Sequence, residues 1–220
     1  MQVQLQRSWW IVSRVFALLL AWHACVAWAA PEDDFRAGSQ AYRGGDVVQA
    51  MARLKASADA GYAPAQSLLA YILNQADFND EAVAYYRKAA AQGDAEGEFG
   101  LGSMYAAGEG VKRDPAEARK WITRAAERGH VPAVRLLALA YVKGELGIDE
   151  AERGSADALR WVRRAADSGD VAAMEQLAFA YRTGAYGLAV DLKQAEEYAA
   201  KVRTAQGVTG KGAAKKREKK

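Results

Sequence analysis

The feature that most constrains this chain is a residue pattern that recurs four times along it. Each copy is centred on a glycine (Gly61, Gly93, Gly129 and Gly169), and the spacing between successive glycines grows from 32 to 36 to 40 residues. Small or apolar residues stand four, eight, nine and twelve positions after each glycine, which places them on one face of a helix. The repetition predicts a structure built from stacked copies of one unit.

A second helix precedes each glycine. Alanine stands eleven positions before the glycine in every copy, and an aromatic ring stands eight positions before it at Tyr85, Trp121 and Trp161. Alanines beside large rings favour close helix–helix contact. We call the helix after the glycine helix A and the helix before it helix B. Aspartates with an N-cap spacing are expected to begin three of the B helices, at Asp46, Asp114 and Asp191.

Shorter units flank the four copies, so the pattern predicts about five helix pairs. One pair cannot bury its apolar face alone, and neighbouring pairs must therefore stack into a continuous core. The prediction for residues 30–206 is an all-α fold, a right-handed α/α superhelical solenoid. The growth in spacing falls in glycine-rich turns between A and B and in extra residues near 144–154.

One copy also carries a family resemblance. It contains Leu101-Gly102-Ser-Met104-Tyr105, then Gly108-Glu-Gly110-Val111, and then Asp114 through Trp121. With these residues the segment 95–126 resembles the Sel-one-like repeat (SLR) family, a branch of the TPR-like α/α solenoids. The resemblance implies a solenoid fold, and exported bacterial members are mostly adaptors in the cell envelope. A cysteine-rich branch of the family does not match, because Cys25 is the only cysteine.

The first 29 residues are typical of a secretory signal peptide. Arg7 and Arg14 are their only charged residues, residues 15–26 are apolar, and Ala27-Trp28-Ala29 is a cleavage-site pattern. We expect cleavage after Ala29 and a periplasmic or secreted protein. The alternative is an uncleaved membrane anchor, although residues 15–26 are shorter than the roughly 20 residues that span a bilayer. A lipidated Cys25 fits less well.

Charge is distributed unevenly. Residues 30–206 contain 22 basic and 26 acidic residues, which excludes a strongly basic nucleic-acid-binding body. Residues 207–220 contain six bases and one acid, and this low-hydrophobicity tail is expected to be disordered. The tail either aids solubility or attracts an anionic membrane or an acidic polymer. Nucleic acid is not expected as a partner.

The residues needed for catalysis or metal binding are scarce. After removal of the signal only His130 remains of the two histidines, and it occupies a turn position held elsewhere by Asp94 and Asp170. We interpret it as a turn or capping residue rather than a general base. The acids Asp149, Glu150 and Glu152 are expected in a solvated loop, with a weak Ca²⁺ site as the alternative. We predict no enzyme activity, no cofactor and no metal.

Partner binding is the remaining class of function. Positions six, ten and thirteen after the glycine lie opposite the packing face of helix A, and they vary from copy to copy. Large apolar groups and arginines there are typical interface anchors. The alternative is that these side chains pack on adjacent helices or cap the array. The predicted partner-binding residues are Tyr71, Asn74, Phe99, Arg135, Leu139, Phe179 and Arg182.

We therefore predict a non-catalytic scaffold or adaptor of the bacterial cell envelope. It would dock a protein or peptide partner on the concave groove formed by the A helices. The alternative function is a module that binds cell-wall polysaccharide or peptidoglycan, or a hydrolase that acts on such a polymer. Hydrolysis would require two convergent carboxylates, and no pair of acids here departs from caps and exposed helix faces.

Overall fold

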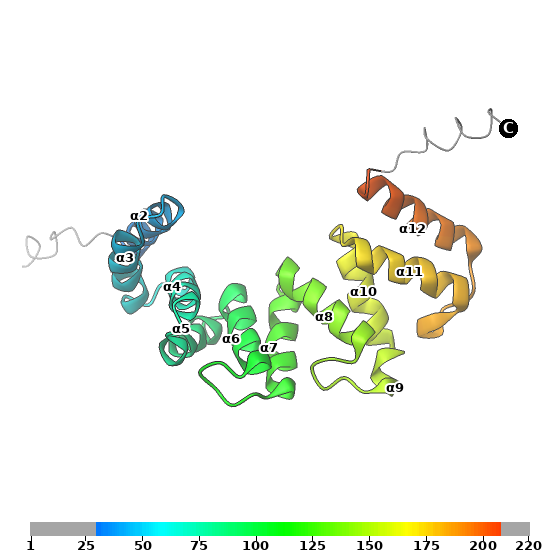
Figure 1. The fold of residues 1–220 in the computed structure, drawn as a ribbon, viewed down its shortest axis with the longest axis horizontal. Helices are drawn as coiled ribbons and strands as arrows, with labels where there is room; N and C mark the ends of the chain where they lie inside the picture. The colour runs from blue at the N-terminus through cyan, green and yellow to red at the C-terminus, as the bar shows by residue number, and fades with distance from the viewer. Residues whose placement is uncertain (1–29, 208–220) are drawn as a thin grey trace, which may run out of the picture.

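The structure, a computed structural model, describes residues 30–207, which form an arch of helices and contain no β-strand (Figure 1). The first six helices are α2 (Pro31–Arg43), α3 (Val47–Asp59), α4 (Ala63–Gln75), α5 (Asn79–Ala91), α6 (Ala95–Ala107) and α7 (Pro115–Glu127). The next elements are α8 (Val131–Lys143), α9 (Glu150–Arg153), α10 (Ala156–Asp167), α11 (Val171–Thr183), the 3₁₀ turn η1 (Ala185–Gly187) and α12 (Leu192–Ala205).

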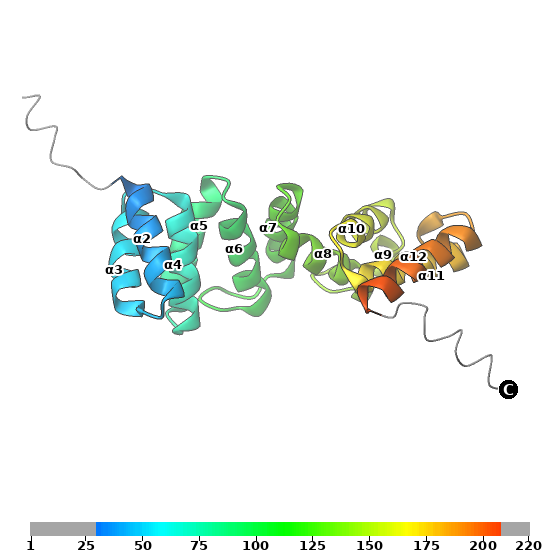
Figure 2. The same cartoon turned by 90° about the horizontal axis from the view of Figure 1, so that it is seen from above.

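The helices pack as five consecutive pairs. The partners are α2 with α3, α4 with α5, α6 with α7, α8 with α10, and α11 with α12, and each pair also contacts the next one along the chain. Seen from above, the pairs follow one another in a row from α2 to α12 (Figure 2). The prediction of an all-α solenoid of about five helix pairs is confirmed.

The recurring glycines close the turns between B and A helices. All four have a left-handed backbone, with φ between +77° and +93°, a conformation that glycine adopts without steric penalty. Each following A helix then receives its cap from the next residue where that residue is polar. Asp94 and Asp170 each accept a hydrogen bond from a backbone N–H three residues on, both at 2.8 Å.

The three aspartates predicted to cap B helices all do so. The side chain of Asp46 accepts from the N–H of Gln49 at 3.0 Å. Asp114 and Asp191 each accept from two backbone N–H groups of the first turn that follows. The helix starts are therefore determined by local hydrogen bonds, which explains why they could be predicted from the sequence.

The core is built from the recurring small and apolar positions. The alanines eleven residues before each glycine are all fully buried, and so are the leucines eight residues after it: Ala50, Ala82, Ala118, Ala158, Leu69, Leu101, Leu137 and Leu177. The two tryptophans in equivalent positions differ, since Trp161 is 1% exposed and Trp121 is only half-buried. The buried residues form two clusters, one in residues 41–104 and the other in residues 118–177, and Tyr105 packs against both.

The longest insertion, between α8 and α10, contains a short helix rather than a solvated loop alone. Its acids form the one-turn helix α9, whose capping box links Asp149 and Glu152. Both carboxylate oxygens of Glu152 accept from Nη1 of Arg119 on α7, at 2.9 and 3.0 Å. The expectation of a plain loop is corrected here, because this ion pair holds the inserted residues against the preceding unit.

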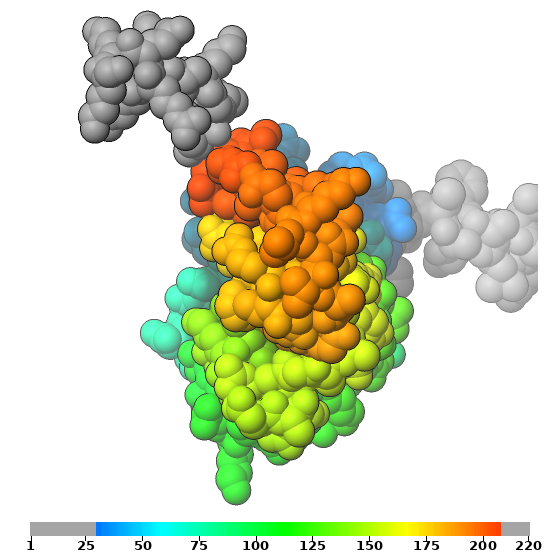
Figure 3. Space-filling view, turned by 90° about the vertical axis from the view of Figure 1, so that its right-hand side faces the viewer, coloured from blue at the N-terminus to red at the C-terminus, as the bar shows by residue number. Residues whose placement is uncertain are grey.

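The last pair lies on the unit formed by α8 and α10 at the C-terminal end of the stack, which faces the viewer in Figure 3. The predicted signal peptide (1–29) and nearly all of the basic tail (208–220) lie outside the described residues. Among the helices of residues 30–207, none has the length and apolar character needed to cross a membrane.

Candidate docking groove between α8 and α11

A groove separates two consecutive A helices, α8 and α11. Its volume is about 430 Å³, and its floor includes Val162 of the B helix α10. One wall carries the larger side chains and the other is largely built from small residues, which leaves the space between them unfilled. The walls include Pro132, Leu136 and Leu139 from α8, and Ala172, Ala173 and Gln176 from α11.

The junction between the earlier A helices is closed more tightly. In α6 a Cβ atom built on Gly97 would lie 2.5 Å from Cβ of Ala89 and 3.0 Å from Oγ of Ser67 on α4. Helix α6 thus approaches its neighbours at a distance that only glycine permits. The corresponding position in α8 is Ala133 and in α11 it is Ala173. Close contact through glycine at this position is therefore found in α6 and not in α8 or α11, and the groove lies further along the stack.

A charged pair stands at the mouth of the groove. Nη2 of Arg135 donates to the backbone oxygen of Ser168 at 3.3 Å, and Nε lies 3.7 Å from a carboxylate oxygen of Asp170. The side chain of Asp170 caps the N-terminus of α11, where it accepts a hydrogen bond from the N–H of Ala173. Arg135 is therefore anchored at the backbone, while its pairing with Asp170 is long and solvent-exposed.

A second hollow of about 450 Å³ adjoins the groove, and both are lined by Val142 and Gln176. Phe179 lines this second hollow together with Tyr186 of η1, and burial raises the pKa of the Tyr186 hydroxyl. Leu139 is 39% exposed and Phe179 is 54% exposed. The structure thus brings three predicted residues, Arg135, Leu139 and Phe179, to one continuous depression along α8 and α11.

The other predicted partner-binding residues lie elsewhere. Tyr71 is exposed on α4, and Arg182 is exposed near the end of α11. The amide nitrogen of Asn74 donates to Asn79 at 2.8 Å and to Glu109 at 3.0 Å, so it joins α4 to two later segments. The ring of Phe99 is only partly buried and packs against the ring of His130, with 4.8 Å between centroids. Phe99 therefore packs on a residue at the start of the adjacent helix α8, as in the alternative considered for these side chains.

His130 caps helix α8. Its Nδ1 accepts from the backbone N–H of Ala133 at 3.2 Å, and its Nε2 lies 3.0 Å from a carboxylate oxygen of Glu96. With Nδ1 as the acceptor, the proton of the neutral ring is on Nε2, which donates to Glu96. Both ring nitrogens thus have structural partners, in agreement with the interpretation of His130 as a capping residue.

Several residues of the groove could not be predicted from the sequence. Pro132, Ala172 and Gln176 fall outside the positions that were expected to face a partner, yet they line the depression. Their exposure depends on the separation of α8 and α11, which single-helix periodicity does not report. Within the described part of the chain, no group of three or more histidine, cysteine, aspartate or glutamate side chains is arranged to hold a metal ion.

The stacked hairpins, the left-handed glycine turns and the groove between consecutive A helices define an α/α solenoid repeat protein of the kind that binds partners along its length. The model of the Sel1 repeat matches residues 63–94, 95–130, 131–170 and 171–201, and the chain belongs to the Sel1 repeat family. Sel1 repeats commonly mediate protein–protein interactions, and scaffold families of this kind are generally non-catalytic.

Two solved structures resemble the chain in fold. One is c5321, a protective antigen of uropathogenic Escherichia coli with an SLR fold (TM-score 0.69, 30% identity). The match covers 79% of this chain and 38% of that one. The other is a Sel1 repeat protein from Oxalobacter formigenes (TM-score 0.61, 27% identity), with 78% and 70% of the two chains covered.

Two curated relatives match a shorter region. They are the proteins of Rattus norvegicus and Mus musculus named DAP3-binding cell death enhancer 1, each 38% identical over 87 residues. The match covers 39% of this chain and 17% of each relative. The matched region is thus about a sixth of their length, and the likeness is restricted to part of the repeat array.

Proposed function

We propose that this protein is a non-catalytic scaffold of the bacterial cell envelope and that it docks a peptide segment of a protein partner in the groove between α8 and α11. The observation that carries the proposal is the unfilled, mainly apolar groove of about 430 Å³ beside a half-exposed Leu139. An apolar concavity with a few polar groups at its mouth is the common form of a ligand site.

The chemistry of the groove defines the partner. Its walls accept an aliphatic or aromatic side chain, and the adjoining hollow offers the exposed ring of Phe179 to a second one. Arg135 stands at the mouth with only a long, exposed ion pair, so a carboxylate of the partner would find a charged donor there. The partner segment would therefore combine apolar anchors with an acidic residue.

The location in the envelope is a proposal from the sequence. It depends on the arginines, the apolar run and the cleavage-site pattern of residues 1–29. The basic residues after Gly207 would add electrostatic attraction to an anionic membrane or an acidic envelope polymer. Fractionation of cells that express the full chain, with the mass of the mature protein measured, tests cleavage after Ala29.

The docking site can be tested by site-specific photocrosslinking. A photoreactive residue is placed at Leu139, and in a control at Val48, which is 85% exposed on α3 and lies outside the groove. A protein crosslinked only from position 139 is identified by mass spectrometry, purified, and titrated against the wild type, Leu139→Asp and Val48→Asp. We expect Leu139→Asp to weaken binding about tenfold or more, as for a central interface anchor, and Val48→Asp to leave it unchanged.

Equal affinities for Leu139→Asp and the wild type would overturn the placement of the site. Both substitutions are at exposed positions, so we expect the helices to be retained. Circular dichroism of both variants checks this.

A further inference from the structure

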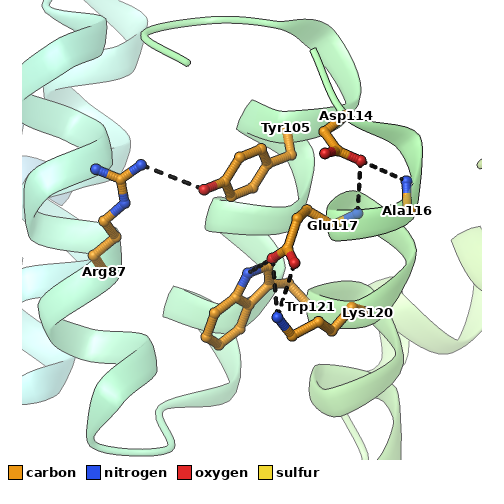
Figure 4. A network of polar contacts seen from close by, with 7 residues as sticks. All are labelled: Arg87, Tyr105, Asp114, Ala116, Glu117, Lys120 and Trp121. Atoms are coloured by element: carbon orange, nitrogen blue, oxygen red, sulfur yellow. Dashed lines mark hydrogen bonds and ion pairs between the residues drawn. The ribbon is translucent and has the colours of Figure 1, made fainter. Parts of the chain in front are cut away.

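Another hollow, of about 700 Å³, lies away from the groove and from the hollow beside it, between α5, the end of α6 and the glycine-containing loop that leads into α7. The residues that matter for its chemistry are Arg87, Tyr105, Lys112, Arg113, Asp114 and Glu117. In Figure 4 the guanidinium of Arg87 extends from α5 toward the ring of Tyr105, and its Nη2 donates to the Tyr105 hydroxyl at 3.3 Å.

The two carboxylates at this hollow are already engaged. Oδ1 of Asp114 accepts from the N–H groups of Ala116 and Glu117, at 3.0 and 3.1 Å, and so caps α7. Figure 4 shows the carboxylate of Glu117 turned toward Lys120 and Trp121. It accepts from Nζ of Lys120 at 2.9 and 3.1 Å and from Nε1 of Trp121 at 3.1 Å.

The cationic side chains at the hollow, in contrast, have no carboxylate partner among the described residues. Arg87, Lys112 and Arg113 are exposed, and none of them has a carboxylate of residues 30–207 within 4.0 Å. Nε of Arg113 donates to the backbone oxygen of Ala106 at 3.1 Å, which holds this side chain against the end of α6. Two of the three cations are thus positioned by neutral groups, and their charge is left for a ligand.

The last unit of the chain supplies an internal comparison. There, too, an arginine of helix B donates to a tyrosine of helix A, from Nη2 of Arg163 to the Tyr181 hydroxyl at 3.3 Å. The loop also closes in the same way, since the N–H of Asp191 donates to the Tyr181 oxygen at 2.8 Å and that of Asp114 to the Tyr105 oxygen at 2.9 Å. In the residues just before Asp191, Ala189 and Val190 replace Lys112 and Arg113. This loop therefore closes without the two cations, and the fold does not require them.

We propose that the hollow binds an acidic peptide segment of a partner, with its carboxylates paired to Arg87, Lys112 and Arg113. Arginine forks and lysine ammonium groups are suited to carboxylates, and the hollow is large enough for several residues of a peptide. Tyr105, Val111 and Pro115 supply apolar wall for the carbon atoms of the segment. A peptide fits this mixture of charge and apolar surface better than a bare oxyanion does.

The test uses the full chain and a fluorescein-labelled peptide of six glutamates, with fluorescence anisotropy at about 0.15 M salt, where long-range attraction is screened. Arg87→Gln removes one cation, and the double variant Lys112→Ala/Arg113→Val copies residues 189 and 190. Arg163→Gln is the matched control, because it breaks the same arginine–tyrosine contact outside the hollow. We expect about fivefold weaker binding for the double variant, as for the loss of two exposed ion pairs, and unchanged binding for Arg163→Gln.

The basic residues beyond Gly207 are also expected to attract this acidic peptide. The binding site is therefore located by NMR, from the changes in backbone amide chemical shifts when the peptide is added. Changes at residues 105–117 that vanish in the double variant support the proposal. Changes confined to residues beyond 207, or equal loss of affinity in Arg163→Gln, overturn it. Displacement of the peptide by an equal concentration of inorganic phosphate would also overturn the peptide assignment and would define a site for the oxyanion alone.

Discussion

The fully buried carboxylate of Glu98 in α6 lies 3.0 Å from Nε of Arg128, the residue that follows α7. A second arginine of this pair, Arg124, lies 2.9 Å from the other carboxylate oxygen and stacks over the Trp121 ring at 4.6 Å. In the preceding pair the equivalent contact is neutral, from Nε2 of Gln92 to Oε1 of Gln66 at 2.8 Å. The same position thus joins helices A and B by a charged contact in one unit and by an amide contact in the other.

The charged contact is expected to stabilise the α6–α7 pair. Glu98→Gln leaves Arg124 and Arg128 without their carboxylate, but both are partly exposed and can be hydrated, so the cost is about 1–3 kcal/mol in the free energy of unfolding. Urea denaturation measures it. Adding Arg128→Gln copies the Gln66–Gln92 contact and should cost less than the sum of the single changes. Additive losses would contradict a direct coupling.

An exposed ion pair serves as the control. Asp33→Asn removes the carboxylate that pairs with Arg36 and should change the free energy of unfolding by less than about 0.5 kcal/mol.

Gly102 should resist substitution because α7 lies against it. A Cβ atom at this position would lie 2.7 Å from Cγ1 of Ile122 and 3.1 Å from the backbone oxygen of Ala118. We expect Gly102→Ala to cost about 1–3 kcal/mol through overpacking, although alanine favours helix by about 1 kcal/mol. Thermal unfolding of Gly102→Ala and Gly154→Ala checks this. Gly154 has no atom within 4 Å of a built Cβ and a negative φ, so its substitution should be neutral or slightly stabilising. A loss of stability as large as that of Gly102→Ala would contradict the packing argument.

The buried hydroxyl of Tyr86 predicts a loss of stability in alkali. Burial raises the pKa of Tyr86 well above its usual value of about 10. The folded protein therefore keeps this proton when the unfolded chain has lost it, and the stabilisation present below pH 10 decreases as the pH rises above about 10, by up to ~1.4 kcal/mol per pH unit. Urea midpoints between pH 9 and 11 test this.

The variant Tyr86→Phe should lose less stability across this alkaline range than the wild type. Val48→Ala, at an exposed position without a titratable group, should follow the wild type and serves as the control. Parallel alkaline curves for Tyr86→Phe and the wild type would show that other groups dominate, such as Tyr85, Tyr141, Tyr186 and Tyr198, whose pKa values burial also raises.

Two tryptophans in equivalent positions should differ in their contribution to stability. Trp161 is 1% exposed, and its replacement by alanine should cost about 3–5 kcal/mol. Trp121 is half-buried and keeps its Nε1 bonded to Glu117, so the same change there should cost clearly less. Urea denaturation followed by circular dichroism compares the two. Equal losses would mean that the shared sequence position, rather than the burial, determines the contribution.

Much of the fold could be predicted because its determinants are local. Small and apolar residues at helical spacing, aspartates at helix starts and glycines at the turns each act within a few residues along the chain. The caps at Asp46, Asp114 and Asp191 and the left-handed glycines are where the sequence placed them. The helical turn α9 was not predicted, although its capping box of Asp149 and Glu152 is a local signal; only the ion pair of Glu152 with Arg119, 33 residues away, lay beyond local reasoning.

The candidate site was only partly predictable. Periodicity identified which side of each A helix varies, but Phe99 and Phe179, which both lie on that side of their helices, have different surroundings. Phe99 packs on His130, whereas Phe179 is 54% exposed at the edge of a hollow. The difference arises from the neighbouring unit, whose side chains are not part of the helix that carries the residue.

The sequence by itself determined the number and kind of repeating helix pairs, since helix periodicity, capping and glycine turns are short-range effects. Only the tertiary structure decided how far apart the consecutive A helices α8 and α11 lie and which cations remain without a carboxylate. These properties depend on how side chains of separate units fill the space between helices. At the junction of α4 and α6 the residue facing the preceding A helix is Gly97, and at the junction of α8 and α11 it is Ala173, while the helical pattern of the sequence stays the same.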